Sequence, residues 1–529
     1  MKRWLPGVAA VLAVAASACT GAADRTADDG TRSTSSSATQ VTRNGSASAS
    51  ASSASSAERP APIPRGLDRF YAQRPTWATC GEGFQCARVE VPINYRKPRG
   101  DVLRLSVVRL RAANAGVRIG SLVLNPGGPG ASGVAYARRA GTELSDAVRR
   151  RFDVVGFDPR GVGESDPVQC LDDQETDALI AADPTPDDTA EVRAAVAQAK
   201  DLAAQCRAEG GELLAHVGTA DAARDMDVLR AVLGERRLNY LGKSYGTFLG
   251  AMYAERFPGN VGRFVLDGAL DPALDTDTTN LGQAQGFEVA TRAFVGDCVR
   301  REGCPLGSDV EGGIARLQRF LRDLDARPVR TRDAARPLTE GRGSLGVATA
   351  MYDDRFWPVL RQGLQSAING DGNTLLLLAD ALTDRGPDGF RSNANTVIFA
   401  VNCMDRPERG GLPAVQRSLP RYTQAAPTWG PFLAWSQLPC AYWPVQGTGK
   451  VEPLRARGSG PIVVLGTTRD PATPYAWAQG LAAQLDNGHL VTYDGDGHTA
   501  YHRGSSCIDQ AVDDYLLRGQ VPREGLRCE

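Results

Sequence analysis

The chain has 529 residues, of which 42% are hydrophobic and 23% are charged, and its formal net charge is -1 at pH 7. This composition is typical of a globular protein, and the length suits one large domain with an insertion, or two domains. The balanced charge argues against nucleic acid as a partner, because there is no basic excess to neutralise phosphates.

The first 18 residues are predicted to be an export signal. Two basic residues precede an apolar run from Leu5 to about Ala18, which is too short to span a bilayer as a permanent helix. The small residues Ala16-Ser-Ala18 form a cleavage site before Cys19. A cysteine at this place is similar to the lipid-modified cysteine of bacterial lipoproteins, which would anchor the protein to the outer face of the cell membrane. Plain secretion after the same cut is the alternative.

Residues 19–58 are predicted to be a disordered stalk. This segment consists almost entirely of Ser, Ala, Thr and other small polar residues. Such a composition cannot bury enough apolar surface to offset the entropy lost on ordering. A stalk between an anchor and a folded domain fits the lipid-anchored alternative.

The cysteine count agrees with export. Apart from Cys19 the chain has ten cysteines, an even number that indicates disulfide bonds in an oxidising compartment. Metal ligation is disfavoured, because no two cysteines form a C-x-x-C pair and the four histidines do not cluster with them. Closeness in sequence suggests five pairs, which are Cys80–Cys86, Cys170–Cys206, Cys298–Cys304, Cys403–Cys440 and Cys507–Cys528.

Strands and helices alternate along most of the folded part. Residues 87–95 and 102–110 look like an antiparallel hairpin at the edge of a sheet. Apolar runs predict further strands at 119–125, 152–158, 263–267, 461–466 and 489–493, and one more strand that begins at Leu238. Helices are predicted at 221–234, from the turn at Ser244 to Pro258, at 508–517, and as helical excursions between 167 and 218. This alternation is typical of a mostly parallel sheet flanked by helices.

Between residues 271 and 457 the alternation stops. Apolar residues there recur at helical spacing, as within 314–324, so this segment is predicted to be a large, mainly helical cap inserted before the last strands. The core would then comprise residues 59–270 and 458–529. The insertion also contains three tryptophans that are candidates for pocket walls, although packing is the simpler role for each: Trp429, Trp435 and Trp443.

A serine lies where a predicted strand turns sharply into a helix. Gly242-Lys-Ser244-Tyr-Gly246 fits G-x-S-x-G, the nucleophile elbow of α/β-hydrolases. The glycines avoid collisions on a strained turn, and the N-terminus of the next helix points N–H groups at a developing oxyanion. In this fold the N–H of Tyr245 is one oxyanion donor. Gly127 or Gly128, in a Gly/Pro-rich loop after a strand, would supply the second, and Gly128 is favoured.

Another loop is expected to brace this turn. Asp158, Arg160 and Ser165 follow the strand at 152–158, and we expect them to pin the loop beside the elbow by hydrogen bonds. That role is structural, since no histidine is placed to activate Ser165.

The chain order Ser, acid, His of α/β-hydrolases indicates Asp470 and His498 as partners of Ser244. Asp470 follows a late strand, and His498 lies in a glycine-flanked loop from which a general base can reach the serine. The mechanism would pass through an acyl-enzyme and requires no metal or organic cofactor. Asp494 and Asp496 are rival acids, interpreted as turn residues because they lie so near His498 in sequence.

The other histidines suit the general base less well. His216 precedes the serine in the chain, and His489 begins a strand. His502 lies beyond the loop and is expected at the surface.

Together these motifs resemble the secreted tripeptidyl aminopeptidases of bacteria, relatives of the prolyl iminopeptidases. The resemblance extends from about Trp77 to Cys528. It implies an α/β-hydrolase fold, a triad of Ser244, Asp470 and His498, and the removal of short peptides, typically tripeptides, from a free N-terminus. The motifs that carry it are Asn125-Pro-Gly-Gly-Pro-Gly130, Asp158-Pro-Arg-Gly-Val-Gly163, Gly242-Lys-Ser-Tyr-Gly-Thr247, Leu266-Asp-Gly268, Asp470-Pro-Ala-Thr-Pro474 and Gly497-His-Thr499.

An aminopeptidase of this type needs a buried acid in its cap to hold the substrate's ammonium group. Asp405 is the candidate, because Cys403 would hold its segment rigidly if it forms a disulfide. A solvated or salt-bridged aspartate is the alternative. The predicted partners are peptides with a free N-terminus, and the only membrane contact expected is through a lipid on Cys19.

Two further hypotheses remain open. The superfamily also contains esterases, so a carboxylesterase with the same triad is the second hypothesis, beside the peptidase. A non-catalytic envelope lipoprotein that keeps the fold as a binding module is the third, since folds can outlive functions.

Overall fold

The computed structural model describes residues 63–407 and 410–529, all within one compact unit, Arg59–Glu529. The predicted export signal (1–18), the segment 19–58 and the proposed lipid site Cys19 lie outside the described residues. Within the described ranges, no helix combines the length and the apolar character needed to cross a bilayer.

A ten-stranded sheet forms the centre, with the strand order β1-β2-β3-β5-β4-β6-β7-β10-β11-β12. The first three strands pair antiparallel, and β3 pairs antiparallel with β5; the remaining pairs are parallel. A separate two-stranded hairpin lies within the insertion. The strands are β1 (Ala78–Thr79), β2 (Phe84–Pro92), β3 (Val102–Leu110), β4 (Gly120–Asn125), β5 (Phe152–Phe157), β6 (Leu238–Lys243), β7 (Val261–Asp267), β8 (Arg385–Gly386), β9 (Gly389–Phe390), β10 (Ile462–Arg469), β11 (Gly488–Asp496) and β12 (Arg527–Cys528).

Helices cover both faces of this sheet. Adjacent residues of a strand point to opposite faces, and Tyr240 and Leu241 of β6 accordingly belong to two different apolar clusters. Helices α7, α8 and α18 contribute to the cluster of Tyr240, and α2, α4 and α19 to that of Leu241. The helices of the core are α1 (Asp68–Tyr71), α2 (Gly133–Arg138), α3 (Ala140–Glu143), α4 (Asp146–Arg151), α5 (Asp173–Ala181), α6 (Thr189–Gly210), α7 (Thr219–Val232), α8 (Tyr245–Arg256), α18 (Tyr475–Gln484) and α19 (Ser506–Arg518).

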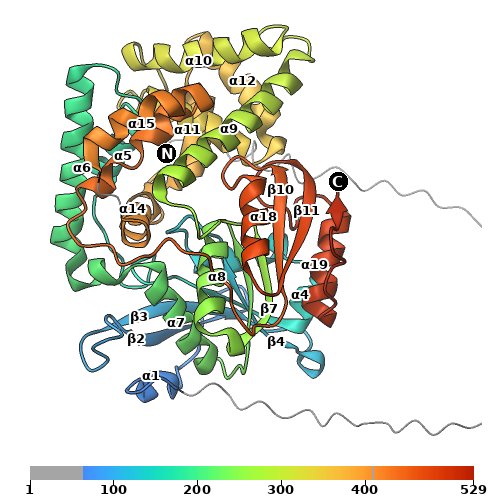
Figure 1. The fold of residues 1–529 in the computed structure, drawn as a ribbon. Coiled ribbons are helices and arrows are strands. Elements are labelled where there is room, and N and C mark those ends of the chain that lie inside the picture. Colours follow the sequence, from blue (N-terminus) through green and yellow to red (C-terminus); the bar gives the residue numbers. More distant parts are fainter. Residues whose placement is uncertain (1–62, 408–409) are drawn as a thin grey trace, which may run out of the picture. The chain divides into compact units, whose positions relative to one another are not determined.

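The segment between β7 and β10 is a mainly helical insertion with an apolar core of its own. Figure 1 draws its helices, yellow-green to orange, gathered at one end of the sheet. Trp429 is 2% exposed in that core, and its Nε1 donates to Thr291 Oγ1 at 2.8 Å. The helices of the insertion are α9 (Thr276–Val299), α10 (Val310–Ala326), α11 (Glu340–Met351), α12 (Trp357–Ile368), α13 (Asn373–Leu382), α14 (Ala394–Asp405), α15 (Gly411–Ala425), α16 (Gly430–Trp435) and α17 (Leu438–Ala441).

The predicted α/β-hydrolase fold, with an antiparallel edge hairpin, a parallel sheet and a helical insertion, is confirmed. The short strands β1, β8, β9 and β12 were not predicted, because two residues carry no readable alternation. Trp435 and Trp443 pack against apolar residues, as Trp429 does, so packing is the role that their contacts support. All five suggested disulfides form: Cys80–Cys86, Cys170–Cys206, Cys298–Cys304, Cys403–Cys440 and Cys507–Cys528.

Ser165 and Arg160 hold the loop after β5 by hydrogen bonds, as expected, although these bonds reach β3 and α7 and not the turn of Ser244. Ser165 Oγ donates to the backbone oxygen of Asp158 at 2.6 Å and accepts the N–H of Ser106 at 2.8 Å. Arg160 is fully buried and binds both carboxylate oxygens of Asp225, at 2.7 and 2.6 Å. Such bidentate pairs fix geometry as well as charge, so this loop is a rigid support for its neighbours.

Candidate active site

Ser244 stands on the turn between β6 and α8, and its backbone has φ 55° and ψ -127°. A non-glycine residue rarely adopts a positive φ, and such strain concentrates at functional sites. The two flanking glycines permit the turn. A Cβ at Gly242 would lie 2.4 Å from the backbone oxygen of Gly246, and one at Gly246 would lie 2.8 Å from Asn125 Oδ1. The collisions that the G-x-S-x-G pattern predicts are therefore present.

The glycine-rich loop after β4 lies directly against this turn. A Cβ on Gly127 would approach Ser244 Cβ to 2.8 Å and the backbone nitrogen of Tyr245 to 3.0 Å. The N–H of Gly127 is already used, since it donates to Asn125 Oδ1 at 3.0 Å. The N–H groups of Tyr245 and Gly128 have no partner within the described residues. This difference favours Gly128 over Gly127 as the second oxyanion donor.

His498 and Asp470 contact each other directly. Nδ1 of His498 lies 2.9 Å from both carboxylate oxygens of Asp470, and Thr473 Oγ1 lies 3.3 Å from the same nitrogen. Asp470 Oδ1 also accepts the N–H groups of Ala472 and Thr473, at 2.9 and 2.8 Å. An acid held in this way fixes the imidazole in one orientation and one tautomer.

The remaining nitrogen of the imidazole is unpaired. Nε2 of His498 is buried and has no hydrogen-bond partner within the described residues, so the contact to Ser244 is not made. Ser244 and His498 nevertheless both lie beside the end of β7. The N–H of Ser244 donates to the backbone oxygen of Asp267 at 2.9 Å, and a Cβ on Gly268 would lie 3.1 Å from Cε1 of His498.

The insertion contacts the loop of His498 and the loop of Asp470. Tyr352, just after α11, accepts the N–H of His498 at 2.9 Å on its backbone oxygen, and its ring packs edge-on against the imidazole at 5.3 Å. In α9, a Cβ on Gly286 would lie 2.6 Å from the backbone oxygen of Pro471. No sequence signal pointed to Tyr352, because its contact depends on how the insertion packs.

The rival candidates are engaged elsewhere. Asp494 and Asp496 lie at the end of β11. Asp494 pairs with Arg469 of β10 and with Arg527 of β12, and Asp496 pairs with Arg469. Neither aspartate contacts His498. They belong to a strand, so their interpretation as turn residues is wrong, although their exclusion as contacts of His498 is confirmed.

The other three histidines contact residues other than Ser244. His216 pairs with Asp221, and His489 binds the side chain of Asn487. His502 is half-buried rather than at the surface, and its ring packs edge-on against Tyr501.

Asp405 ends α14 and is 6% exposed. Its Oδ1 accepts the N–H of Thr219, the first residue of α7, at 2.7 Å, and its Oδ2 accepts the Thr219 hydroxyl. The same hydroxyl contacts the phenol of Tyr245, the residue after Ser244. Burial raises the pKa of Asp405 to about 6. A carboxylate is thus buried one hydroxyl away from the side chain of Tyr245, at a helix N-terminus that favours negative charge.

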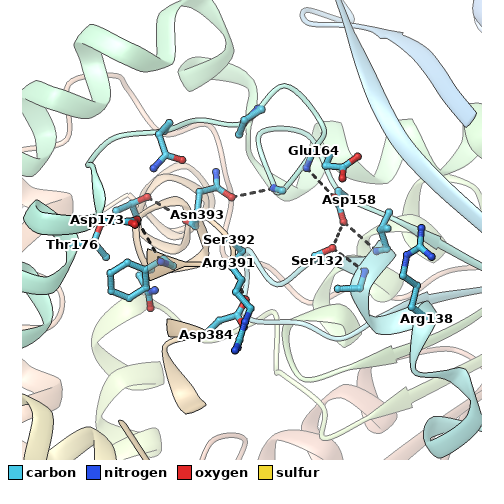
Figure 2. Close-up of a pocket in the computed structure, with 18 of the residues that line it drawn as sticks. Ser132, Arg138, Asp158, Glu164, Asp173, Thr176, Asp384, Arg391, Ser392 and Asn393 are labelled. Carbon is cyan, nitrogen blue, oxygen red and sulfur yellow. Dashed lines mark hydrogen bonds and ion pairs between the residues drawn. The ribbon is translucent and has the colours of Figure 1, made fainter. Parts of the chain in front are cut away.

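A cavity of about 630 Å³ lies between the core and the insertion. Figure 2 shows Ser132 and Asp158 on its core side and Asp384, Arg391 and Asn393 on the side of the insertion. Ser244, Asp470 and His498 do not line it. It starts at Ser132, two residues after Gly130, and is therefore adjacent to the glycine-rich loop.

Hydrogen bonds across the cavity tie its two sides together. Asn393 accepts the N–H of Gly163 at 3.0 Å and donates to the backbone oxygens of Gly161 and Val168 at 2.8 and 3.1 Å. On the core side itself, Ser132 Oγ donates to Asp158 Oδ1 at 2.6 Å. The start of α14 is thereby fixed to the loop after β5.

Comparison with known proteins adds sequence relationships to this geometry. Residues 426–528 match a family model described as TAP-like protein. The chain is 40% identical over 459 residues to the serine protease Hip1 of Mycobacterium tuberculosis, covering 84% of this chain and 87% of Hip1. It is 39% identical over 478 residues to carboxylesterase B of the same organism, covering 86% and 90% of the two chains. It is 34% identical over 478 residues to the tripeptidyl aminopeptidase of Streptomyces lividans, covering 85% and 86%.

Proposed function

Because the chain belongs to the α/β-hydrolase family that includes serine protease Hip1 and the Streptomyces tripeptidyl aminopeptidase, we propose that it removes short peptides, typically tripeptides, from free N-termini. The observation that carries this proposal is the pairing of His498 with Asp470 beside the strained turn of Ser244. An acid, a base and a serine in this arrangement are the machinery of acyl transfer.

In the proposed mechanism, Nε2 of His498 removes the hydroxyl proton of Ser244, and Oγ attacks the scissile carbonyl carbon. The oxyanion accepts the N–H groups of Tyr245 and Gly128, and His498 then protonates the leaving amine. Water, activated by the same imidazole, releases the peptide from the acyl-enzyme. Each oxyanion donor contributes about 10² to 10³ in kcat, and general base catalysis about 10² to 10⁴.

Asp405 is our proposed site for the substrate's ammonium group. Its carboxylate is buried and is linked through the Thr219 hydroxyl to the phenol of Tyr245. The backbone N–H of the same tyrosine is one of the proposed oxyanion donors, so the length of this side chain separates that donor from Thr219. Three residues of an extended peptide span about 10 Å, so a tripeptide bound by Ser244 presents its amino terminus at a distance of that order. A buried carboxylate gains most from a cation that replaces lost hydration.

We also propose that the protein is exported. Five disulfide bonds in the described residues support an oxidising compartment, since such bonds are rare in the cytosol. Lipid on Cys19 would keep the enzyme at the outer face of the cell membrane, and secretion without lipid is the alternative. Mass spectrometry of the mature N-terminus distinguishes these two forms.

A carboxylesterase is the second candidate function, favoured by the 39% identity to carboxylesterase B. The same triad cleaves esters and amides, so substrates must decide. The test compares a tripeptide anilide with a free amine, its N-acetylated form and a short-chain aryl ester, using the wild type and Ser244→Ala. Cleavage that prefers the free amine and is lost in Ser244→Ala supports the peptidase. Ester cleavage alone supports the esterase, and no turnover favours a binding protein.

A further inference from the structure

Asp267 ends β7 and holds two different parts of the candidate site. Its backbone oxygen accepts the N–H of Ser244 at 2.9 Å. Its carboxylate accepts the N–H of Ala500 at 2.8 Å through Oδ1 and that of Tyr501 at 3.0 Å through Oδ2. These two residues follow His498 by two and three positions. One fully buried residue therefore binds both the nucleophile and the loop of the histidine.

Lys243, the residue before Ser244, strengthens this connection. It lies opposite Asp267 in the register of β6 and β7 and is 8% exposed. Its Nζ donates to the backbone oxygen of Tyr501 at 3.4 Å and to Glu143 Oε2 at 3.1 Å. The variable position of the G-x-S-x-G motif is thus occupied by a buried cation that also binds the histidine loop.

The titratable groups around Asp267 come from four elements. Lys243 extends from β6, Glu143 from α3 and Tyr136 from α2, while His498 lies in the loop after β11. Burial raises the pKa of Asp267, and the positive charge of Lys243 opposes that rise. A buried carboxylate without partners would be costly, so two N–H donors and a nearby cation are what the anion requires.

We propose that Asp267 is a positioning residue, which sets the distance between Ser244 and the imidazole of His498. This inference rests on the proposed serine-hydrolase function. Asp470 orients the ring by binding Nδ1, and Asp267 places the backbone of the loop that carries the ring. Since Asp267 touches neither the ring nitrogens nor Ser244 Oγ, it acts through the two residues it holds. A misplacement of about 1 Å in such a site can lower the rate about 100-fold.

The test variant is Asp267→Asn, which keeps the size of the side chain but turns one acceptor oxygen into an NH₂ group that faces Ala500 or Tyr501. We expect kcat on a tripeptide anilide to fall at least about tenfold. KM should stay unchanged, because no substrate contact is removed. The rate of covalent labelling of Ser244 by a fluorophosphonate should fall in proportion to kcat.

The matched control is Asp227→Asn. Asp227 is 2% exposed and accepts hydrogen bonds from Tyr71, Tyr253 and Asn260 in the apolar layer on one face of the sheet. We expect this variant to lose thermal stability and to keep wild-type kcat. Should Asp267→Asn fold poorly, Lys243→Met removes the bond to the Tyr501 oxygen instead and is expected to lower kcat several-fold at unchanged KM.

Three results overturn the inference in distinguishable ways. Wild-type kcat and labelling in Asp267→Asn would show that the loop keeps its position without the carboxylate. Equal losses of kcat in Asp267→Asn and Asp227→Asn would reduce the effect to general destabilisation. Failure of the wild type itself to react with the fluorophosphonate would refute the proposed function, and the positioning role with it.

Discussion

Nδ1 of His498 lies 2.9 Å from both carboxylate oxygens of Asp470. Because Nδ1 donates to this acid, Nε2 is left as the basic nitrogen, and it is the nitrogen that has no partner within the described residues. The acid itself cannot swing away, since Ala472 and Thr473 hold Oδ1 through their N–H groups. The pair therefore presents a base of fixed tautomer at the end of the sheet where Ser244 turns.

The first prediction concerns this acid. Asp470→Asn should lower kcat about 10³- to 10⁴-fold, because the amide favours the wrong tautomer of His498 while leaving the fold intact. Asp494→Asn is the matched control, since Asp494 is the rival acid and pairs only with neighbouring polar and basic groups. Steady-state kinetics on the tripeptide anilide measure both. A larger loss in the Asp494 variant would reassign the acid.

The second prediction concerns the glycine-rich loop. In Gly127→Ala, the new Cβ would lie 2.5 Å from the backbone oxygen of Lys243 and 2.8 Å from Ser244 Cβ, at a residue whose φ is 97°. The loop must move, so the oxyanion donor that we propose at Gly128 should be lost and kcat should fall about 10²- to 10³-fold. Gly141→Ala is the control, because nothing lies within 4 Å of a Cβ there. Retained kcat in Gly127→Ala would place the donor elsewhere.

Much of this site was predictable because it depends on local patterns. A strand, a sharp turn with glycines around Ser244 and an apolar helix form one continuous segment, and the order of Ser244, Asp470 and His498 follows from the topology of the sheet. Disulfide partners were predictable from proximity in sequence, as with Cys80 and Cys86.

The contacts that escaped prediction link residues far apart in the chain. Tyr352 contacts His498 because the insertion packs against the loop of His498, and no periodicity in the segment of Tyr352 indicates that contact. Lys243 and Asp267 are charged residues at strand ends, where solvent exposure is the usual expectation. Their burial depends on partners that lie far away in the chain: Glu143 pairs with Lys243, and the backbone of Tyr501 forms hydrogen bonds with both residues.

The third prediction separates recognition of the substrate amine from a structural role for Asp405. In Asp405→Asn the negative charge is lost while the amide can still bind Thr219. If the carboxylate holds the ammonium group, KM for the free-amine anilide should rise at least about tenfold, as expected for a lost buried charge pair, while aryl ester cleavage stays unchanged. Equal losses on the free-amine anilide, its acetylated form and the ester would instead assign Asp405 to support of α7.

The fourth prediction concerns stability and pH at the junction of α5, α6 and α11. Glu340 is 5% exposed and accepts the Thr185 hydroxyl, with the carboxylates of Asp183, Glu191 and Asp325 nearby. Burial, reinforced by the carboxylates of Asp183 and Asp325, raises the pKa of Glu340 to about 8. A carboxyl group whose pKa rises on folding stabilises the protein fully below its unfolded pKa of 4.5, and this contribution is lost as the pH rises toward about 8.

Glu340→Gln imitates the protonated side chain and should therefore remove that loss. We compare the free energy of unfolding of the variant with that of the wild type at each pH. This difference should favour the variant by at least about 1 kcal/mol more at about pH 8 than at about pH 5, since one proton changes the free energy of unfolding by about 1.4 kcal/mol per pH unit. Urea denaturation at the two pH values measures the difference. Glu209→Gln, at an exposed position of α6, controls for the loss of one surface charge. An equal effect of Glu340→Gln at both pH values would mean that Glu340 is ionised throughout this range and that its neighbours, or solvent, accommodate the charge.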